Sequence, residues 1–195
     1  MALALALLAA GSASRMRGGD KLLETVHGAP LLRHLALQAL AARLGPVAVT
    51  LRRRDPARRA ALKGLALTRL PVANAAEGMA ASLRQAALWA QQSGAEGLIL
   101  CPTDMPELTS GDFKALAAAF HPDGPPLRAS TDDGRVGHPV LFPARLLPAF
   151  STLAGDIGAR NLLCSNPPDL VPLPGTHALT DLDTPEAWAA WRAKG

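Results

Sequence analysis

The chain has 195 residues, of which 49% are hydrophobic and 18% charged, with a formal net charge of +4. This composition excludes an intrinsically disordered chain, and the length predicts a single domain over residues 1–195. Two cysteines, Cys101 and Cys164, are too few for a disulfide framework or for a zinc site built of cysteines alone, so we expect a cytoplasmic protein.

The first ten residues, MALALALLAA, form an apolar run with two competing interpretations. The run is too short for a membrane-spanning helix, which needs about 20 apolar residues, and we expect no membrane association. Its length suits a secretion signal, but no basic segment precedes it. The second interpretation is a strand buried on both faces that leads into a functional loop, and the downstream residues favour it.

Apolar segments alternate with helical ones over the first 120 residues. We expect strands at residues 2–9, 47–51, 65–72 and 97–101, and helices at residues 30–44, 77–92 and 109–120. A further helix is expected to begin at Asp55-Pro56, a cap residue followed by proline. This alternation predicts an α/β fold in which helices cover both faces of a largely parallel sheet. Ligands of such sheets bind beyond the carboxyl ends of the strands.

Shorter elements are expected from residue 122 onwards. The turn signal Asp132-Asp133-Gly134 joins two β-like segments, and we expect this small β-hairpin insertion to lie on the sheet. The remaining expected elements are helices at 157–164 and 186–193, a short helix from residue 144, and strands at 170–173 and 178–182.

A cluster of five arginines, Arg52, Arg53, Arg54, Arg58 and Arg59, is the densest concentration of charge. We interpret it as a solvated loop and helix face. A nucleic-acid-binding protein would add a recognition motif and stacking aromatics, and only 4% of the residues are aromatic, so we expect no nucleic-acid binding. The modest basic excess suits an enzyme that acts on polyanions such as nucleotides.

The loop that follows the first expected strand, GSASRMRGGDK, spans residues 11–21. Its glycines and serines let backbone N–H groups converge on an anion, and Arg15 and Lys21 add positive charge. The loop matches neither the Walker P-loop nor the GxGxxG fingerprint. It therefore indicates a phosphate-binding loop of another kind, with a plain surface loop as the alternative.

Acidic and small polar residues follow other expected strands. Asp104 in CPTDMP comes after a buried strand and, together with the basic loop, suggests a nucleoside triphosphate with Mg²⁺ between them; an ordinary turn residue is the alternative. Asn74, in the NAAEGMAASL segment, is a candidate for nucleotide contact or a helix cap. In DLDTPEAW, Asp181 and Asp183 lie two apart, which on a strand would turn both carboxylates toward one metal; the same segment also suits a helix start.

Together these segments resemble the molybdenum cofactor nucleotidyltransferases, the MobA-like NTP transferases. The LAAG form of residues 8–11 and the DLDTPE segment are similar to the molybdopterin cytidylyltransferase branch. The resemblance implies a Rossmann-like three-layer sandwich. It also implies transfer of CMP from CTP to the terminal phosphate of molybdopterin, with Mg²⁺ as cofactor and pyrophosphate as the second product. The implied partners are the nucleotide, a phosphorylated pterin-type acceptor, and a molybdoenzyme or its chaperone.

The resemblance also assigns roles to residues by their position in these motifs. The catalytic residues would be Arg15, Lys21 and Asp104, and the metal ligands Asp104 and Asp183. The nucleotide would contact Leu8, Ala9, Ala10, Gly11, Ser12, Asn74, Gly78 and Ser82. The acceptor would contact His138, Pro139, Asp156 and Arg160.

The motifs depart from the family pattern at Ala13, at Arg17 and in TDMP, where relatives often have serine, glycine and GDQP. The acceptor therefore stays open. One alternative is a cytidylyl- or guanylyltransferase that uses another phosphorylated acceptor, such as methylerythritol phosphate or a sugar phosphate. Another is a non-catalytic cofactor-binding chaperone with the same fold.

Overall fold

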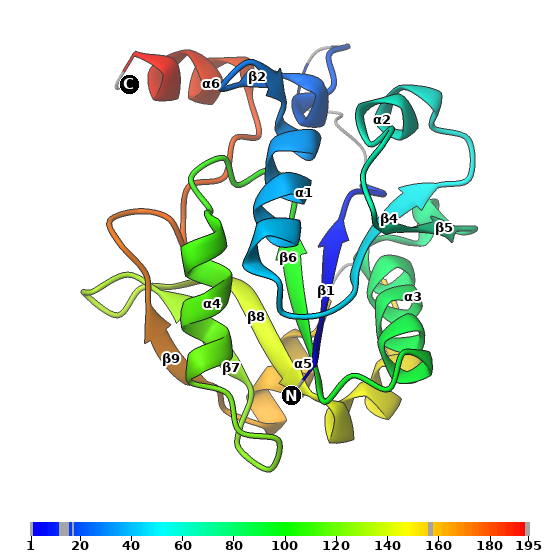
Figure 1. Ribbon diagram of the computed structural model, residues 1–195, viewed down its shortest axis with the longest axis vertical. Helices are drawn as coiled ribbons and strands as arrows, with labels where there is room; N and C mark the ends of the chain where they lie inside the picture. The colour runs from blue at the N-terminus through cyan, green and yellow to red at the C-terminus, as the bar shows by residue number, and fades with distance from the viewer. Residues whose placement is uncertain (1, 12–15, 17, 156–157, 194–195) are drawn as a thin grey trace.

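The computed structural model describes residues 2–11, 16, 18–155 and 158–193. Within these ranges seven strands form one sheet in the order β5-β4-β1-β6-β8-β7-β9 (Figure 1). The strands are β1 (Leu3–Leu8), β4 (Val47–Arg52), β5 (Thr68–Val72), β6 (Gly97–Pro102), β7 (Leu127–Ser130), β8 (Val136–Pro143) and β9 (Asp169–Pro172). Of these seven, β8 alone runs against the others. A separate two-stranded sheet pairs β2 (Thr25–Val26) with β3 (Ala29–Pro30).

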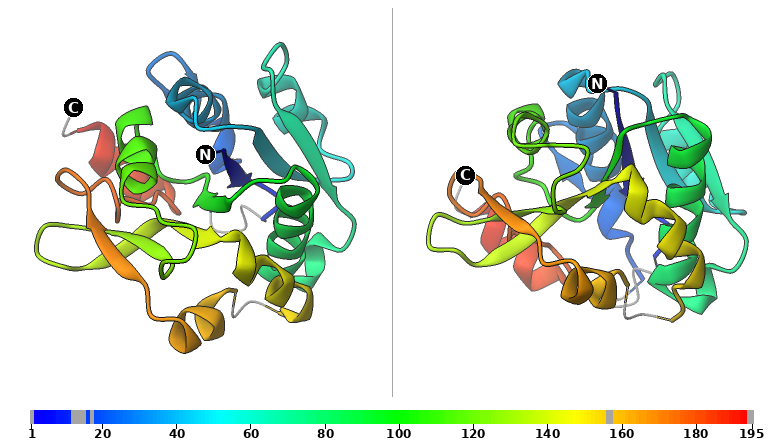
Figure 2. Two further views of the ribbon diagram at one scale, coloured as in Figure 1. Left: turned by 60° about the horizontal axis from the view of Figure 1, so that its bottom comes forward. Right: turned by 90° about the horizontal axis from the view of Figure 1, so that it is seen from below.

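Helices cover both faces of the large sheet, which makes three layers (Figure 2). The α-helices are α1 (Leu31–Ala42), α2 (Pro56–Ala61), α3 (Met79–Gln92), α4 (Ser110–Ala118), α5 (Arg160–Ser165) and α6 (Pro185–Arg192). Short 3-10 helices are η2 (Lys21–Leu23), η3 (Ala75–Glu77) and η4 (Ala144–Thr152). The predicted α/β sandwich with a mostly parallel sheet is confirmed.

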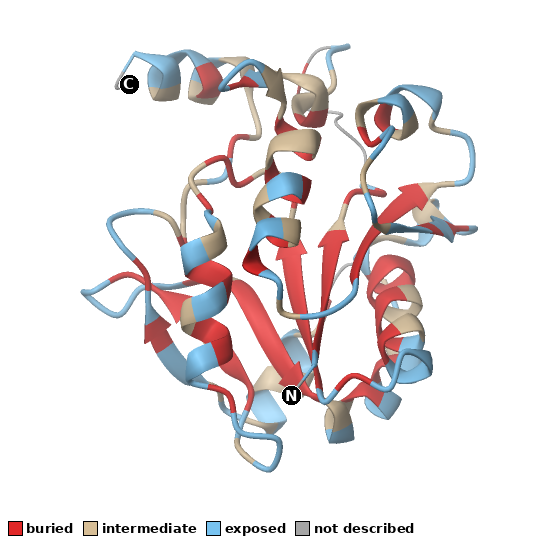
Figure 3. Ribbon diagram, viewed as in Figure 1, coloured by how far each residue is buried: buried red, intermediate tan, exposed pale blue. Residues whose placement is uncertain are grey.

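The alternating leucines and alanines of β1 explain how the sheet holds two different layers. Leu3, Leu5 and Leu7 pack in one core with α1 and α4, while Ala4 and Ala6 face the alanine-rich side of α3 in the other. Successive side chains of a strand point to opposite faces. Because the α3 side carries small residues on both partners, that helix can approach the sheet closely. Figure 3 shows the resulting buried strands beneath partly exposed helices.

Predicted helix starts are confirmed by their capping hydrogen bonds. The Asp55 carboxylate accepts from the Arg58 backbone N–H at 3.1 Å, which begins α2. Thr109 forms a reciprocal capping box with Asp112 at the start of α4. The Thr184 hydroxyl accepts from the Ala187 N–H at 3.2 Å and begins α6.

The hairpin forms, but it is part of the sheet rather than a layer on top of it. Strand β8 pairs antiparallel with β6 along residues 140–143 and with β7 on its other side. The apolar end of β8 is buried on both faces, which is the environment of a central strand.

The predicted strand at 178–182 is wrong. Residues 175–179 form turns in which the Leu179 and Thr180 N–H groups both donate to the Thr176 carbonyl. The segment is attached to β8 by one bond, from the His138 N–H to the Ala178 carbonyl at 2.9 Å. Among the described residues, no helix is long and apolar enough to cross a membrane.

Candidate active site

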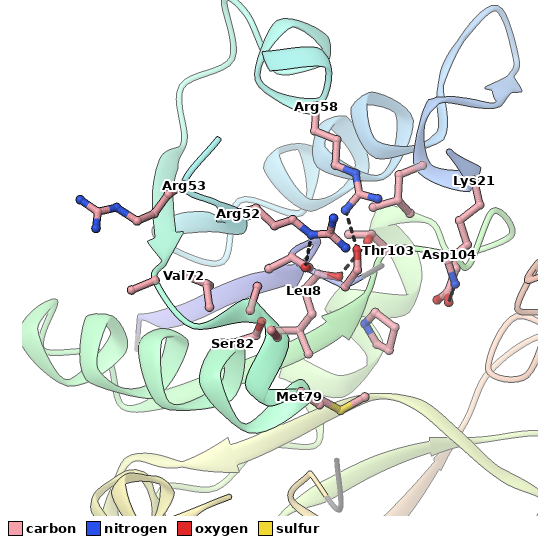
Figure 4. A pocket seen from close by; sticks show the side chains of 18 of the residues that line it. Leu8, Lys21, Arg52, Arg53, Arg58, Val72, Met79, Ser82, Thr103 and Asp104 are labelled. Atoms are coloured by element: carbon pink, nitrogen blue, oxygen red, sulfur yellow. Dashed lines mark hydrogen bonds and ion pairs between the residues drawn. The ribbon is translucent and has the colours of Figure 1, made fainter. Parts of the chain in front are cut away.

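A cavity of about 1350 Å³ lies at the carboxyl ends of the parallel strands. Strands β1, β4 and β6 end at Leu8, Arg52 and Pro102, and all three residues line it. The predicted nucleotide, catalytic and metal residues that line it are Leu8, Ala10, Gly11, Lys21, Gly78, Ser82, Asp104 and Asp183. We refer to this space as the polar cavity (Figure 4).

The acidic end of the polar cavity is built around Lys21. Its ammonium donates to Asp104 Oδ2 at 2.6 Å and to Asp183 Oδ1. The Leu182 N–H donates to the Asp104 carbonyl at 3.0 Å, which brings the segment carrying Asp183 alongside the end of β6. Residues 83 and 162 positions from Lys21 are thereby joined at one point.

The two carboxylates beside Lys21 keep its ammonium positively charged. Burial by itself lowers the pKa of Lys21, but the carboxylates of Asp104 and Asp183 outweigh burial, and the pKa is raised above its usual value. Lys21 is therefore a permanent cation near neutral pH and not a base. The side chains of Lys21, Asp104 and Asp183 keep 16%, 18% and 32% of their surface exposed, so a ligand in the cavity can reach them.

The same carboxylates fit a divalent cation. Mg²⁺ is commonly held by one or two carboxylates, with substrate phosphates and water completing its shell. Asp104 and Asp183 supply such a pair, since both touch one ammonium. Within the described ranges, no group of three or more His, Cys, Asp or Glu side chains is placed to hold a metal ion.

Asp181 does not join this cluster, because its segment is not a strand. The prediction that Asp181 and Asp183 present one common face is therefore wrong. Asp181 is exposed and does not line the polar cavity.

Arginines form another part of the wall of the polar cavity, and the interpretation of the cluster as a solvated face is wrong for Arg58, which is buried. Arg53 and Arg54 are exposed, yet they line the cavity together with Arg52 and Arg58. The Arg58 side chain is only 4% exposed. In Figure 4 Arg53 lies at the end of the cavity away from Lys21, and Arg52 and Arg58 lie between them.

Sequence reasoning missed this wall because the partners of its arginines lie far away in the chain: Arg52 binds the Ala10 carbonyl and Arg58 binds Asp20. The helix start at Asp55 was a partial signal, since it orients Arg58, but it does not identify Asp20 as the partner. Thr103 was missed as well: its hydroxyl donates to the Leu8 carbonyl at 2.8 Å and ties the ends of β1 and β6 together.

The start of α3 closes the polar cavity from the side. Gly78 precedes the helix with a φ of 99°, a backbone conformation that favours glycine. Ser82, one turn later, is 6% exposed and lines the cavity. Asn74 is exposed and lies outside the lining residues, and Ala9 is buried beneath them.

A second cavity, of about 640 Å³, adjoins the first, and Leu8, Met79 and Pro102 line both. We refer to it as the apolar cavity, because most of its wall is hydrophobic. Besides the three shared residues, its wall includes Leu83, Leu100, Val136, Val140, Phe142, Leu163 and Leu170. Polar groups come from Arg128, His138 and Arg160, two of which are predicted acceptor residues.

His138 is held neutral in this cavity. Burial, reinforced by the positive charge of Arg128 and only partly offset by Asp104, lowers the pKa of His138 to about 4. Its Nδ1 is buried without a hydrogen-bond partner among the described residues. Pro139, joined to His138 by a cis peptide bond, is buried behind the wall and does not line the cavity.

Three predicted residues, Ser12, Arg15 and Asp156, lie outside the described residues. The others divide between the two cavities, apart from Ala9, Asn74 and Pro139. A doubly covered, mostly parallel sheet with a basic and acidic cavity at its strand ends is the architecture of a nucleotide-handling α/β enzyme.

Comparison with known proteins narrows this class to one family. The model of the MobA-like NTP transferase domain matches residues 5–169. The chain therefore belongs to the MobA-like NTP transferase family, a family of nucleotidyltransferases. No curated protein sequence matches the chain.

Solved structures with the same fold include two of Rv0371c and one of a further nucleotidyl transferase. Rv0371c of Mycobacterium tuberculosis is 26% identical, with a TM-score of 0.81 over 97% of this chain and 96% of that one. A complex of Rv0371c with manganese aligns at 24% identity, with a TM-score of 0.79 over 97% of both chains. A nucleotidyl transferase of Methanothermobacter thermautotrophicus is 18% identical, with a TM-score of 0.82 over 99% and 97% of the two chains.

Proposed function

We propose that this protein transfers CMP from CTP to the terminal phosphate of molybdopterin and releases pyrophosphate. The observation that carries the proposal is the polar cavity at the strand ends, where the Lys21, Asp104 and Asp183 cluster faces an arginine wall. Such a cavity suits a triphosphate, because cations neutralise its charge and carboxylates can bind it through a divalent cation.

In the proposed reaction an oxygen of the acceptor phosphate attacks the α-phosphorus of CTP. The new phosphorus–oxygen bond forms as the bond from the α-phosphorus to the oxygen bridging to the β-phosphate breaks, and pyrophosphate leaves with that electron pair. Lys21 stabilises the negative charge that collects on the transferring group and the leaving group. No covalent enzyme intermediate is required, and an acceptor phosphate that is already ionised needs no general base.

Asp104 and Asp183 would hold Mg²⁺, which supplies charge neutralisation at the phosphates. The manganese in the Rv0371c complex agrees with a divalent cation in this fold. Arg15, on the basic loop, would add a second phosphate contact.

The apolar cavity favours a pterin-type acceptor over the alternatives. A sugar phosphate or methylerythritol phosphate would bring several hydroxyls, each of which loses free energy when it is buried without a hydrogen-bond partner. The wall offers few partners: Arg128, His138 and Arg160 among predominantly hydrophobic side chains. A flat ring can lie against such a wall, and its polar edge can meet His138 Nδ1.

The choice of CTP rests on the LAAG and DLDTPE segments and is tested first by thermal unfolding with CTP, GTP, ATP and UTP, each with and without Mg²⁺. At about 100 times its Kd, the preferred nucleotide should raise Tm by roughly 5–10 °C, and we expect that shift with CTP and Mg²⁺. A Tm shift with GTP alone would identify GTP, rather than CTP, as the nucleotide substrate. If nucleotide binds but molybdopterin releases no pyrophosphate, methylerythritol phosphate and sugar phosphates are tested next; release with one of them would identify another acceptor, and release with none would favour a non-catalytic cofactor-binding chaperone.

A further inference from the structure

Arg58 is a buried cation in the arginine wall, and its guanidinium is engaged by groups of the protein itself. Its side chain is 4% exposed and lines the polar cavity. The start of α2 fixes its backbone through the bond from its N–H to Asp55. A buried charge is costly unless it is paired, so we infer the role of Arg58 from the groups that its guanidinium binds.

One set of partners lies at the exit of β1. Arg58 Nη1 donates to the carbonyl oxygens of Ala9 at 2.7 Å and Gly11 at 3.0 Å. Arg52 Nε donates to the carbonyl between them, that of Ala10, at 3.0 Å. Three consecutive carbonyls are thus bound by guanidinium groups. Unpaired carbonyl oxygens here would repel an anion, and their engagement leaves this end of the loop more favourable to phosphate.

Two carboxylates also face the guanidinium: Asp55 Oδ2 lies 3.5 Å from Arg58 Nε, and Asp20, at the far end of the same loop, makes the closer contact. Arg58 Nε and Nη2 donate to the two carboxylate oxygens of Asp20 at 2.7 and 2.9 Å. Asp20 Oδ1 also accepts from the Leu22 N–H at 3.1 Å and so begins the turn that carries Lys21. A planar guanidinium bound at two points fixes both distance and direction.

We propose that Arg58 is a positioning residue that holds the two ends of the basic loop, Gly11 and Asp20, in register for binding of the nucleoside triphosphate. The proposal rests on the proposed nucleotide site. Four N–H donors of Arg58 are spent on the loop ends, so it acts through the backbone at Gly11 and through Asp20 and Lys21. A lysine in its place has one ammonium and cannot span a carboxylate and two carbonyls.

The test compares Arg58→Lys with Arg59→Lys, its neighbour on α2, which does not line either cavity. Two quantities are measured on folded protein: the Kd of CTP with Mg²⁺ by calorimetry, and the hydrogen-exchange rate of the Leu22 amide without ligand. We expect Arg58→Lys to raise the Kd by about tenfold or more and to speed exchange at Leu22 by a similar factor, because several charge-assisted hydrogen bonds are lost. Arg59→Lys should change both by less than about twofold.

If Arg58→Lys fails to fold, Asp20→Asn replaces it, because the amide keeps an acceptor for Leu22 and removes the closer of the two carboxylates that pair with Arg58. We then expect a Kd increase of about threefold or more. Unchanged exchange at Leu22 overturns the proposal, and so does faster exchange with an unchanged Kd, since Arg58 would then serve stability alone. If the wild-type protein binds none of the four nucleotides, the proposed function fails, while the exchange result still decides whether Arg58 holds the loop ends.

Discussion

The polar and apolar cavities share Leu8, Met79 and Pro102 but are built by different parts of the fold. Parallel strands β1, β4 and β6 bring charged residues to one edge of the sheet and make the polar cavity. The antiparallel strand β8, with α5, makes the apolar one. The difference teaches that one sheet can present two chemistries side by side: a cavity lined by charged residues at the ends of parallel strands, and a mostly hydrophobic cavity beside it.

The largest expected effect comes from the polar cavity. Asp104→Asn removes a carboxylate from the Lys21 cluster while keeping its size, and we expect the transfer rate to fall by about 10²–10³-fold or more. Pyrophosphate release measures the rate. Asp181→Asn is the matched control, because this exposed carboxylate lies two residues from Asp183 and does not line the cavity. An Asp104→Asn enzyme with near wild-type rate would remove the catalytic role of the cluster.

The second prediction concerns His138 in the wall of the apolar cavity, whose titration should make the protein less stable in acid. Its pKa is lowered from 6.5 to about 4 in the folded protein, so between these values the unfolded chain binds the extra proton and the folded protein does not. The free energy of unfolding should therefore decrease as pH falls from 6.5 toward 4, by roughly 3 kcal/mol at most.

Denaturant unfolding of wild type and His138→Gln across this pH range checks the expectation. The variant should show a shallower loss of stability, while His121→Gln, a change at an exposed histidine, should follow the wild type. Parallel curves for wild type and His138→Gln would show that His138 titrates normally in the folded protein.

The smallest expected effect is a change in the KM for one substrate and not for the other. Arg160→Ala should raise the KM for molybdopterin by about tenfold while leaving the KM for CTP unchanged, because Arg160 lines the apolar cavity and not the polar one. Arg145→Ala, at an exposed arginine outside both linings, is the control. An equal rise in both KM values would mean that the cavities do not divide the substrates.

The local sequence pattern was sufficient to predict the parallel half of the sheet. The alternating leucines and alanines of β1, the cap at Asp55 and the proline after Asp104 each carry their structural signal in a few neighbouring residues. These features place Lys21, Asp104 and the start of α3 at one edge, since the carboxyl ends of parallel strands meet there.

The features that the sequence did not predict depend on contacts between residues far apart in the chain. Arg58 was assigned to solvent because its partner Asp20 lies 38 residues away and no local pattern connects them. The position of β8 within the sheet follows from pairing with β6, which a turn signal cannot specify. The segment around Ala178 has the composition of a strand, but it is held by a turn at Thr176, a backbone bond to β8, and side-chain hydrogen bonds to Glu107 and Asp112 about 70 residues away.

The central claim is transfer of a nucleoside monophosphate between the two cavities, and one measurement tests it directly. The wild-type protein is incubated with CTP labelled at the α-phosphate, Mg²⁺ and molybdopterin, and the label is followed chromatographically. We predict that label appears in a cytidine dinucleotide of molybdopterin together with an equal amount of pyrophosphate, and that Asp104→Asn forms neither at a comparable rate. Label that stays in CTP while the protein demonstrably binds both compounds would contradict the claim.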